Sequence, residues 1–216
     1  MRFAVLGLVA TVLALAGCRG EVRTDLNLST LAAVEDGKAF AVPVRLGFDM
    51  GSAAFCQDHL PSLMVLLDSG YGDSHFLGCR HSGGRVLAEF TVPMPVTAGP
   101  HGKSPVYLRV QDRDGVTVAA LARDEVIIAD MRDLLHPDLR PAFQGPFEVA
   151  ILARLYNDTA APVTLSLPPA VVNGRTRAAA SAITLARGAA LSVAPTAPAE
   201  KGLLQTILPL FWWPST

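Results

Sequence analysis

The N-terminal segment of this chain determines where its folded part can begin. Met1 and Arg2 form a short, positively charged start, and Phe3 to Ala16 is an uncharged apolar run. A run of about 14 residues has the length of the apolar region of a signal peptide, whereas a membrane-spanning helix needs about 20. We therefore expect residues 1–17 to be a signal peptide that is removed before the rest folds. An ordinary secretory signal cleaved near Ala16 and an uncleaved anchor are the alternatives.

The apolar run ends in Leu15-Ala16-Gly17-Cys18, and this ending resembles the lipobox of bacterial lipoprotein precursors. The resemblance implies that Cys18 carries lipid such as palmitate, that the peptide before it is cut off, and that the mature protein is held to a membrane. Several acyl chains on one residue bind firmly, whereas a single chain binds only marginally. In Gram-negative lipoproteins an Asp after the cysteine often signals inner-membrane retention. Arg19 therefore implies the outer membrane and its periplasmic face, with the inner membrane as the alternative.

Composition places the rest of the chain among globular proteins. It has 216 residues, of which 50% are hydrophobic and 17% charged, and its formal net charge is -1. These values exclude a disordered chain, and the near-neutral charge gives no reason to expect a nucleic acid or an anionic lipid as partner. We expect the membrane as one partner, through the lipid on Cys18, an envelope protein as another, and no cofactor.

Two further cysteines, Cys56 and Cys79, follow Cys18. In an oxidising compartment, two such thiols most simply form one disulfide, which would close a loop of about 24 residues. A metal site is an alternative, because Cys56-x-x-His59 and His75-x-x-x-Cys79-x-His81 contain the thiols and imidazoles that bind zinc. Their spacing matches no zinc signature, so we assign no metal ligand. Free thiols are the third alternative.

Alternation of polar and apolar residues predicts an α+β region over residues 18–140. An N-terminal hairpin is expected from strands at 21–28 and 39–48. A helix capped by Ser52 is expected to run through Leu67, with a start or a kink at Pro61. The region is completed by strands at 75–79, 85–96, 106–111 and 116–121, paired as antiparallel hairpins, and by a helix over 124–135.

Residues 147–194 have a different pattern, because short β runs alternate there with turns. The expected strands cover 147–156, 163–167, 170–172, 183–186 and 190–193. The stretches Leu155-Tyr156-Asn157-Asp158-Thr159 and Ile183-Thr184-Leu185 resemble bacterial immunoglobulin-like domains. This resemblance implies a β-sandwich behind the first region, with the boundary at residues 137–146.

The N-terminal half also resembles a set of bacterial lipoproteins of unknown function. The matching residues are Cys18, Glu21, Val22, Thr24 and Leu26, then Cys56 on a helix and Gly78-Cys79 on the next strand. The match covers about residues 18–96. It implies a lipid tether and a disulfide, and it implies no activity.

One pair of motifs resembles the first and last blocks of the GDS-type esterases, namely Gly72-Asp73-Ser74 and Asp133-Leu134-Leu135-His136. The resemblance implies Ser74 as nucleophile, His136 as base and Asp133 as the residue that orients the base. The chain lacks the asparagine that this family places between the blocks, and residues 75–123 predict hairpins instead of a parallel sheet. We therefore expect no enzyme and assign no catalytic residue.

Residues 195–216 form a short linker and a hydrophobic tail in which apolar side chains lie on one face of an expected helix. The tail is too short to span a bilayer. Either it folds back onto the body, or it is an exposed contact for a partner or a membrane interface, where tryptophan is favoured. The candidate contact residues are Leu203, Leu204, Ile207, Phe211, Trp212 and Trp213.

Together these patterns predict a membrane-tethered lipoprotein that faces the periplasm and acts as a non-catalytic binding or assembly module. A small GDS-type esterase that uses Ser74 and a metal-binding lipoprotein are the alternatives.

Overall fold

The computed structural model describes residues 19–35, 38–140, 148–196 and 207–214. The expected signal peptide, Cys18 and the contact residues Leu203 and Leu204 lie outside the described residues. Three helices are present in the described part: α1 (Leu28–Glu35), α2 (Ala53–Tyr71) and α3 (Glu125–Asp133). None of the described helices has the length and apolar character needed to cross a membrane.

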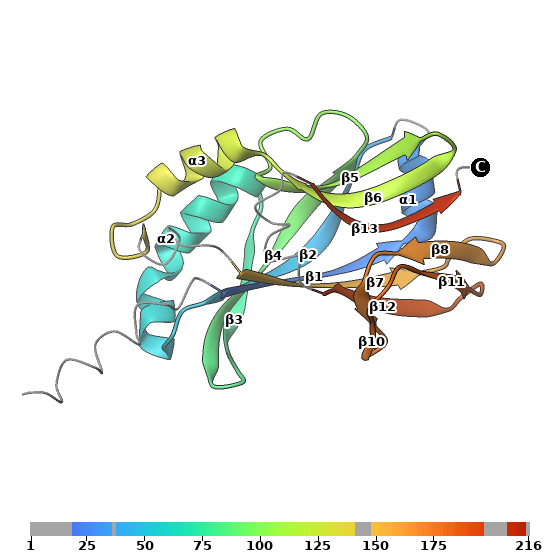
Figure 1. Cartoon of the computed structure of the whole chain (residues 1–216). Coiled ribbons are helices and arrows are strands. Elements are labelled where there is room, and N and C mark those ends of the chain that lie inside the picture. Colours follow the sequence, from blue (N-terminus) through green and yellow to red (C-terminus); the bar gives the residue numbers. More distant parts are fainter. Residues whose placement is uncertain (1–18, 36–37, 141–147, 197–206, 215–216) are drawn as a thin grey trace, which may run out of the picture.

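One 13-stranded, strongly curved and nearly closed sheet forms most of the molecule (Figure 1). The strands of the first half are β1 (Arg19–Asn27), β2 (Phe40–Asp49), β3 (His75–Ser82), β4 (Arg85–Thr97), β5 (Val106–Arg113) and β6 (Val116–Arg123). Those of the second half are β7 (Glu148–Tyr156), β8 (Val163–Leu167), β9 (Ala170–Val172), β10 (Arg175–Arg177), β11 (Ser181–Leu185), β12 (Ala190–Pro195) and β13 (Ile207–Pro214). Their order is β10-β9-β12-β7-β1-β2-β4-β5-β6-β13-β8-β11, and β3 pairs with β4.

The core lies on the concave face of this sheet. In β4 the alternate residues Phe90, Val92 and Met94 are buried, and their neighbours Glu89, Thr91 and Pro93 are partly exposed. The same period of two, which is that of a strand with one buried face, runs through β1 and β7, where Leu26 and Leu155 point inward. The helices cover parts of this apolar interior, and Figure 1 shows α2 and α3 side by side at one end of the sheet with α1 at the other.

The expected N-terminal hairpin is present as a strand pair, but its connection differs from the prediction. β1 and β2 pair antiparallel, yet α1 lies between them where a turn was expected. The first turns of α1 place Leu28, Leu31 and Val34 at a spacing of three, and all three are buried. The sequence contains this spacing, but the segment has only eight residues. The alternation of the strand before it therefore led to the prediction of a strand and a turn without a helix.

The immunoglobulin-like sandwich is not confirmed. The predicted short strands of residues 147–194 are present, but they belong to the same sheet as the first half. β7 pairs in parallel with β1 along all nine residues of that strand, from Arg19 opposite Glu148 to Asn27 opposite Tyr156. Local alternation shows which face of a strand is buried, but it carries no information about which distant strand it pairs with.

The turn after β7 is fastened by two polar residues. Asn157 is fully buried, and its side-chain amide donates to the carbonyl oxygens of Ala161 and Leu185 at 2.9 and 2.8 Å. Asp158 accepts hydrogen bonds from the backbone N–H and the hydroxyl of Ser29 at the start of α1. Desolvation alone would raise the pKa of Asp158, but these hydrogen bonds outweigh it, and the net direction is down.

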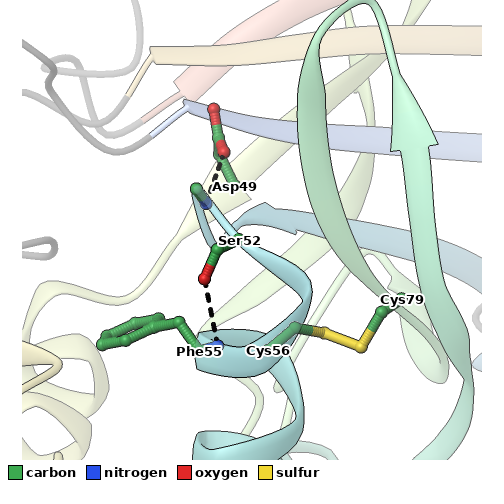
Figure 2. Close-up of a disulfide and its surroundings, with 6 residues drawn as sticks. Asp49, Ser52, Phe55, Cys56 and Cys79 are labelled. Atoms are coloured by element: carbon green, nitrogen blue, oxygen red, sulfur yellow. Dashed lines mark hydrogen bonds between the residues drawn. A yellow bond between two sulfur atoms is a disulfide. The ribbon is translucent and has the colours of Figure 1, made fainter.

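The disulfide between Cys56 and Cys79 is present and ties the first turn of α2 to β3 (Figure 2). The Cα atoms of the two residues are 6.3 Å apart. Ser52 caps the helix as predicted, because its hydroxyl accepts a hydrogen bond from the N–H of Phe55 at 3.1 Å. The helix then continues through Pro61 without a break and ends at Gly72, whose φ of 80° suits glycine.

We expect the double substitution Cys56→Ser/Cys79→Ser to lower the free energy of unfolding by about 3 kcal/mol, because the unfolded chain regains the entropy that the closed loop removes. Urea unfolding followed by circular dichroism measures this change. Adding reductant should shift the wild-type curve onto that of the double variant and leave the variant unmoved. Coinciding curves for oxidised wild type and variant would contradict the expectation.

Candidate functional site: a cationic groove beside the C-terminal strand

The C-terminal segment is a strand, not the expected helix. β13 pairs antiparallel with β6 and touches β8 at Trp212 opposite Ser166. It fills the space between these two strands and so completes the curved sheet (Figure 1). The helical spacing of its apolar residues misled the prediction because a β-bulge breaks the strand's period of two.

The bulge lies at Leu210, between Pro209 opposite Ala120 and Phe211 opposite Ala119. One additional residue reverses which side chains point inward, so Pro209 and Phe211 lie on opposite faces although they are two residues apart. Phe211 is 0% exposed and Trp213 7% exposed in the core, where their rings stack 5.6 Å apart. These two side chains are therefore core residues, and the prediction of an exposed contact is wrong for them.

The side chains of β5, β6 and β13 that do not point into the core lie on the convex face of the sheet. Strand register places one residue from each strand in each row: Tyr107, Ala122 and Ile207, then Arg109, Ala120 and Pro209, then Gln111, Val118 and Trp212. Residues directly opposite each other point to the same face. The small side chains in the middle strand leave a shallow groove of about 50 Å³, lined by Arg109, Gln111, Arg113, Val118, Ala120, Ile207 and Pro209.

Two arginines give this outer-face groove its charge. Arg109 and Arg113 lie four residues apart on β5, which separates their Cα atoms by about 13 Å. Neither guanidinium forms an ion pair with any of the residues that the structure describes. By contrast, Arg80 on β3 is held by Glu89 at 2.7 Å and by Glu21 at 3.3 Å, and these contacts raise its pKa. The groove therefore combines an apolar floor with two arginines that form no ion pair with the described residues.

The esterase residues are not brought together. Ser74 is buried, and its hydroxyl donates to Asp68 at 2.6 Å. The His136 ring lies 5.5 Å from that of His59, near the beginning of α2. Between His59 and the end of α2, about 12 residues at 1.5 Å each span about 18 Å. Ser74 follows that end, so the helix separates it from His136, and the residues do not form the hydrogen-bonded pair that this chemistry needs.

The candidate zinc ligands are also apart. The disulfide takes up both sulfur atoms, so neither Cys56 nor Cys79 is available as a thiolate in this form. His75 contacts Asp73 at 3.5 Å, and His59 packs on the ring of Phe55 at 4.1 Å. Among the described residues, no three His, Cys, Asp or Glu side chains are grouped so as to hold a metal ion.

Comparison with known proteins does not show a family. Neither a protein-family model nor a curated protein matches the sequence. Among solved structures, the folded domain of the Mycobacterium tuberculosis protein LppM aligns with 85% of this chain and 92% of its own, at 10% identity and a TM-score of 0.27. A TM-score this low supports no conclusion about fold or function.

The groove was not predicted from the sequence, although the sequence does show the polar face of β5 that lines one side of it. β5 alternates Tyr107, Arg109, Gln111 and Arg113 with apolar residues, which marks one polar face. The other lining residues come from β13, which is about 100 residues further along the chain and whose exposed face depends on the bulge at Leu210.

We expect Phe211→Ala to lower the free energy of unfolding by about 3–5 kcal/mol, because it leaves a cavity in the core. The matched surface change Arg109→Ala should alter it by no more than about 0.5 kcal/mol, because that side chain makes no ion pair in the described part. Urea unfolding measures both. A loss at Arg109 as large as that at Phe211 would show that the arginine serves stability and would remove the case for a binding site.

Proposed function

We propose that this protein is a lipid-anchored module of the bacterial cell envelope that catalyses no reaction and binds a partner protein through the outer-face groove. Its anchor is lipid on Cys18, and its location is the periplasmic face of the outer membrane. The partner presents an acidic segment. The observation that carries this proposal is the pair of arginines, without an ion pair in the described part, beside an apolar floor.

The anchoring half of the proposal is supported by the sequence and by the disulfide. The apolar run before Cys18 ends in the Leu15-Ala16-Gly17-Cys18 pattern. The Cys56–Cys79 disulfide is consistent with a periplasmic location, since disulfides persist in the periplasm and are rare in the cytosol.

The binding half is supported by charge. Arg109 and Arg113 are spaced so that carboxylates about 13 Å apart on one partner surface could meet both. An arginine guanidinium binds a carboxylate through two parallel hydrogen bonds, which makes such pairs geometrically selective. Apolar contact with Ile207 and Pro209 adds affinity that charge alone does not supply.

The size of the groove favours a protein surface over a small molecule. Pockets for drug-sized ligands measure about 300–1,000 Å³ and enclose most of the ligand. A groove of about 50 Å³ accepts a few side chains and no more. Since the groove lies on the convex face of strands buried on their other side, its geometry is rigid and suits a preformed contact.

We expect the wild-type protein to incorporate radiolabelled palmitate in cells and to fractionate with the outer membrane. Cys18→Ser should abolish the label and release the protein from the membrane fraction, because the thiol that accepts the lipid is gone. Cys56→Ser/Cys79→Ser is the matched control for cysteine loss and should retain the label. Label on the Cys18→Ser protein would contradict the anchor.

We expect a photo-crosslinking amino acid at Gln111 to give a discrete adduct in intact cells. Arg109→Glu/Arg113→Glu should remove that adduct, because the groove would then repel acidic side chains. Arg175→Glu/Arg177→Glu makes the same change of charge on the exposed edge strand β10 and should leave the adduct unchanged. An adduct that survives the change at Arg109 and Arg113 but disappears with the β10 pair would place the contact elsewhere.

A further inference from the structure

The described fold begins one residue after the lipidation position. β1 starts at Arg19, which is paired with Glu148 of β7, and Gly20 is paired with Phe48 of β2. Arg19 is thus one peptide bond from the lipidation position, and consecutive Cα atoms are about 3.8 Å apart. A lipid on Cys18 would hold the body directly at the bilayer, with no linker between them.

Strand register shows which other residues share this end of the sheet. The row that contains Gly20 continues through Phe48 and Ala88 to Cys79. One row further out, next to the start of β1, lie Asp49, Leu87 and Arg80. The last paired row of the β3–β4 hairpin, Ser82 opposite Arg85, extends about 7 Å beyond that, since each row adds about 3.4 Å.

The tip of this hairpin therefore lies two rows beyond the start of β1 at Arg19. The tip consists of Ser82, Gly83, Gly84 and Arg85, and Gly83 and Gly84 have φ angles of 56° and 78°, which make the turn tight. Figure 1 shows the hairpin projecting from the body at the end where β1 begins. Gly83, Gly84 and the neighbouring His81 are exposed.

We propose that the tip of the β3–β4 hairpin, residues 81–85, rests in the headgroup layer of the membrane that holds the lipid on Cys18, and so fixes the orientation of the body. This inference rests on the proposed function, because it needs the lipid. The absence of a linker carries it. Arg85, which forms no ion pair with other described residues, supplies a cation that suits lipid phosphates.

The same register places the outer-face groove far from the membrane. Thr97 at the far end of β4 is paired with Arg109 of β5. Ten rows separate Thr97 from Leu87, which is about 33 Å along the strand. The groove therefore faces the aqueous compartment when the hairpin tip touches the bilayer, and the two surfaces serve different partners.

The test uses the full chain, purified with its lipid and placed in vesicles of phosphatidylethanolamine and phosphatidylglycerol that contain nitroxide-headgroup lipid. Ser82→Trp adds an indole at the tip. Ala182→Trp is the matched control, because Ala182 is exposed on β11 in the same row as Ser166 and Trp212. Tryptophan fluorescence is measured for each variant, and the emission of the wild type, whose tryptophans are Trp212 and Trp213, is subtracted to give that of the added indole.

The expected result is an emission from the added indole at least about twofold lower for Ser82→Trp than for Ala182→Trp, because indoles at the tip would sit at headgroup depth. Ten Gly/Ser residues inserted after Cys18 form a coil of about 17 Å and should remove this quenching while the protein still floats with the vesicles. His81→Trp, at an exposed neighbouring position, serves if Ser82→Trp does not fold.

Two results would overturn the inference, and they are distinguishable. If the wild type and both variants float with the vesicles but the tip is quenched no more than Ala182→Trp, the orientation is wrong and the lipid anchor stands. If the protein does not float at all, and Cys18→Ser behaves identically, the anchor is wrong and the orientation fails with it.

Discussion

β1 is the strand on which the rest of the structure depends, because both of its edges are used over most of its length. It pairs in parallel with β7 along all nine of its residues and antiparallel with β2. It is the only described link between the strands of the first half and β7, β12, β9 and β10 on that side of the sheet. Hydrogen bonds from Ser29 to Asp158 fasten the far end of the same pairing. Any membrane anchor at Cys18 would therefore pull on the centre of the sheet, where the backbone is bonded on both sides.

A single inserted residue lets β13 contribute both to the core and to the groove on the convex face. Without the bulge at Leu210, Pro209 and Phe211 would share one face, and β13 would bury a proline or expose a phenylalanine. With it, Phe211 and Trp213 close the core while Pro209 and Trp212 remain with Arg109 and Gln111 on the convex face. The stability of the core and the shape of the groove thus depend on the same strand. A substitution in β13 that destabilises the fold would also disturb the groove, whereas Arg109→Ala changes the groove alone.

Local signals in the sequence predicted local structure well. The Ser52 cap, the helix after Asp124, the Cys56–Cys79 pair and most strands are found where their patterns place them, because each depends on residues close together in the chain. The pairings of β1 with β7 and of β13 with β6 join segments more than 80 residues apart, and nothing in alternation encodes such partners. The overall charge of -1 also concealed the groove, since 19 acidic residues in the chain offset its 18 lysines and arginines.

The distance between the anchor end and the groove limits what kind of partner can use both. About 33 Å of strand separates the groove from the start of β1, whereas the Debye length is only about 8–10 Å. In the proposed orientation, anionic headgroups at that end would not compete with an acidic protein for Arg109 and Arg113. If the proposed lipid is attached at the residue before Arg19, the body has no linker that would let it turn the groove toward its own bilayer. In that orientation the proposed acidic partner would approach from the aqueous side, and a long linker at Cys18 should broaden its angles of approach without changing the groove itself.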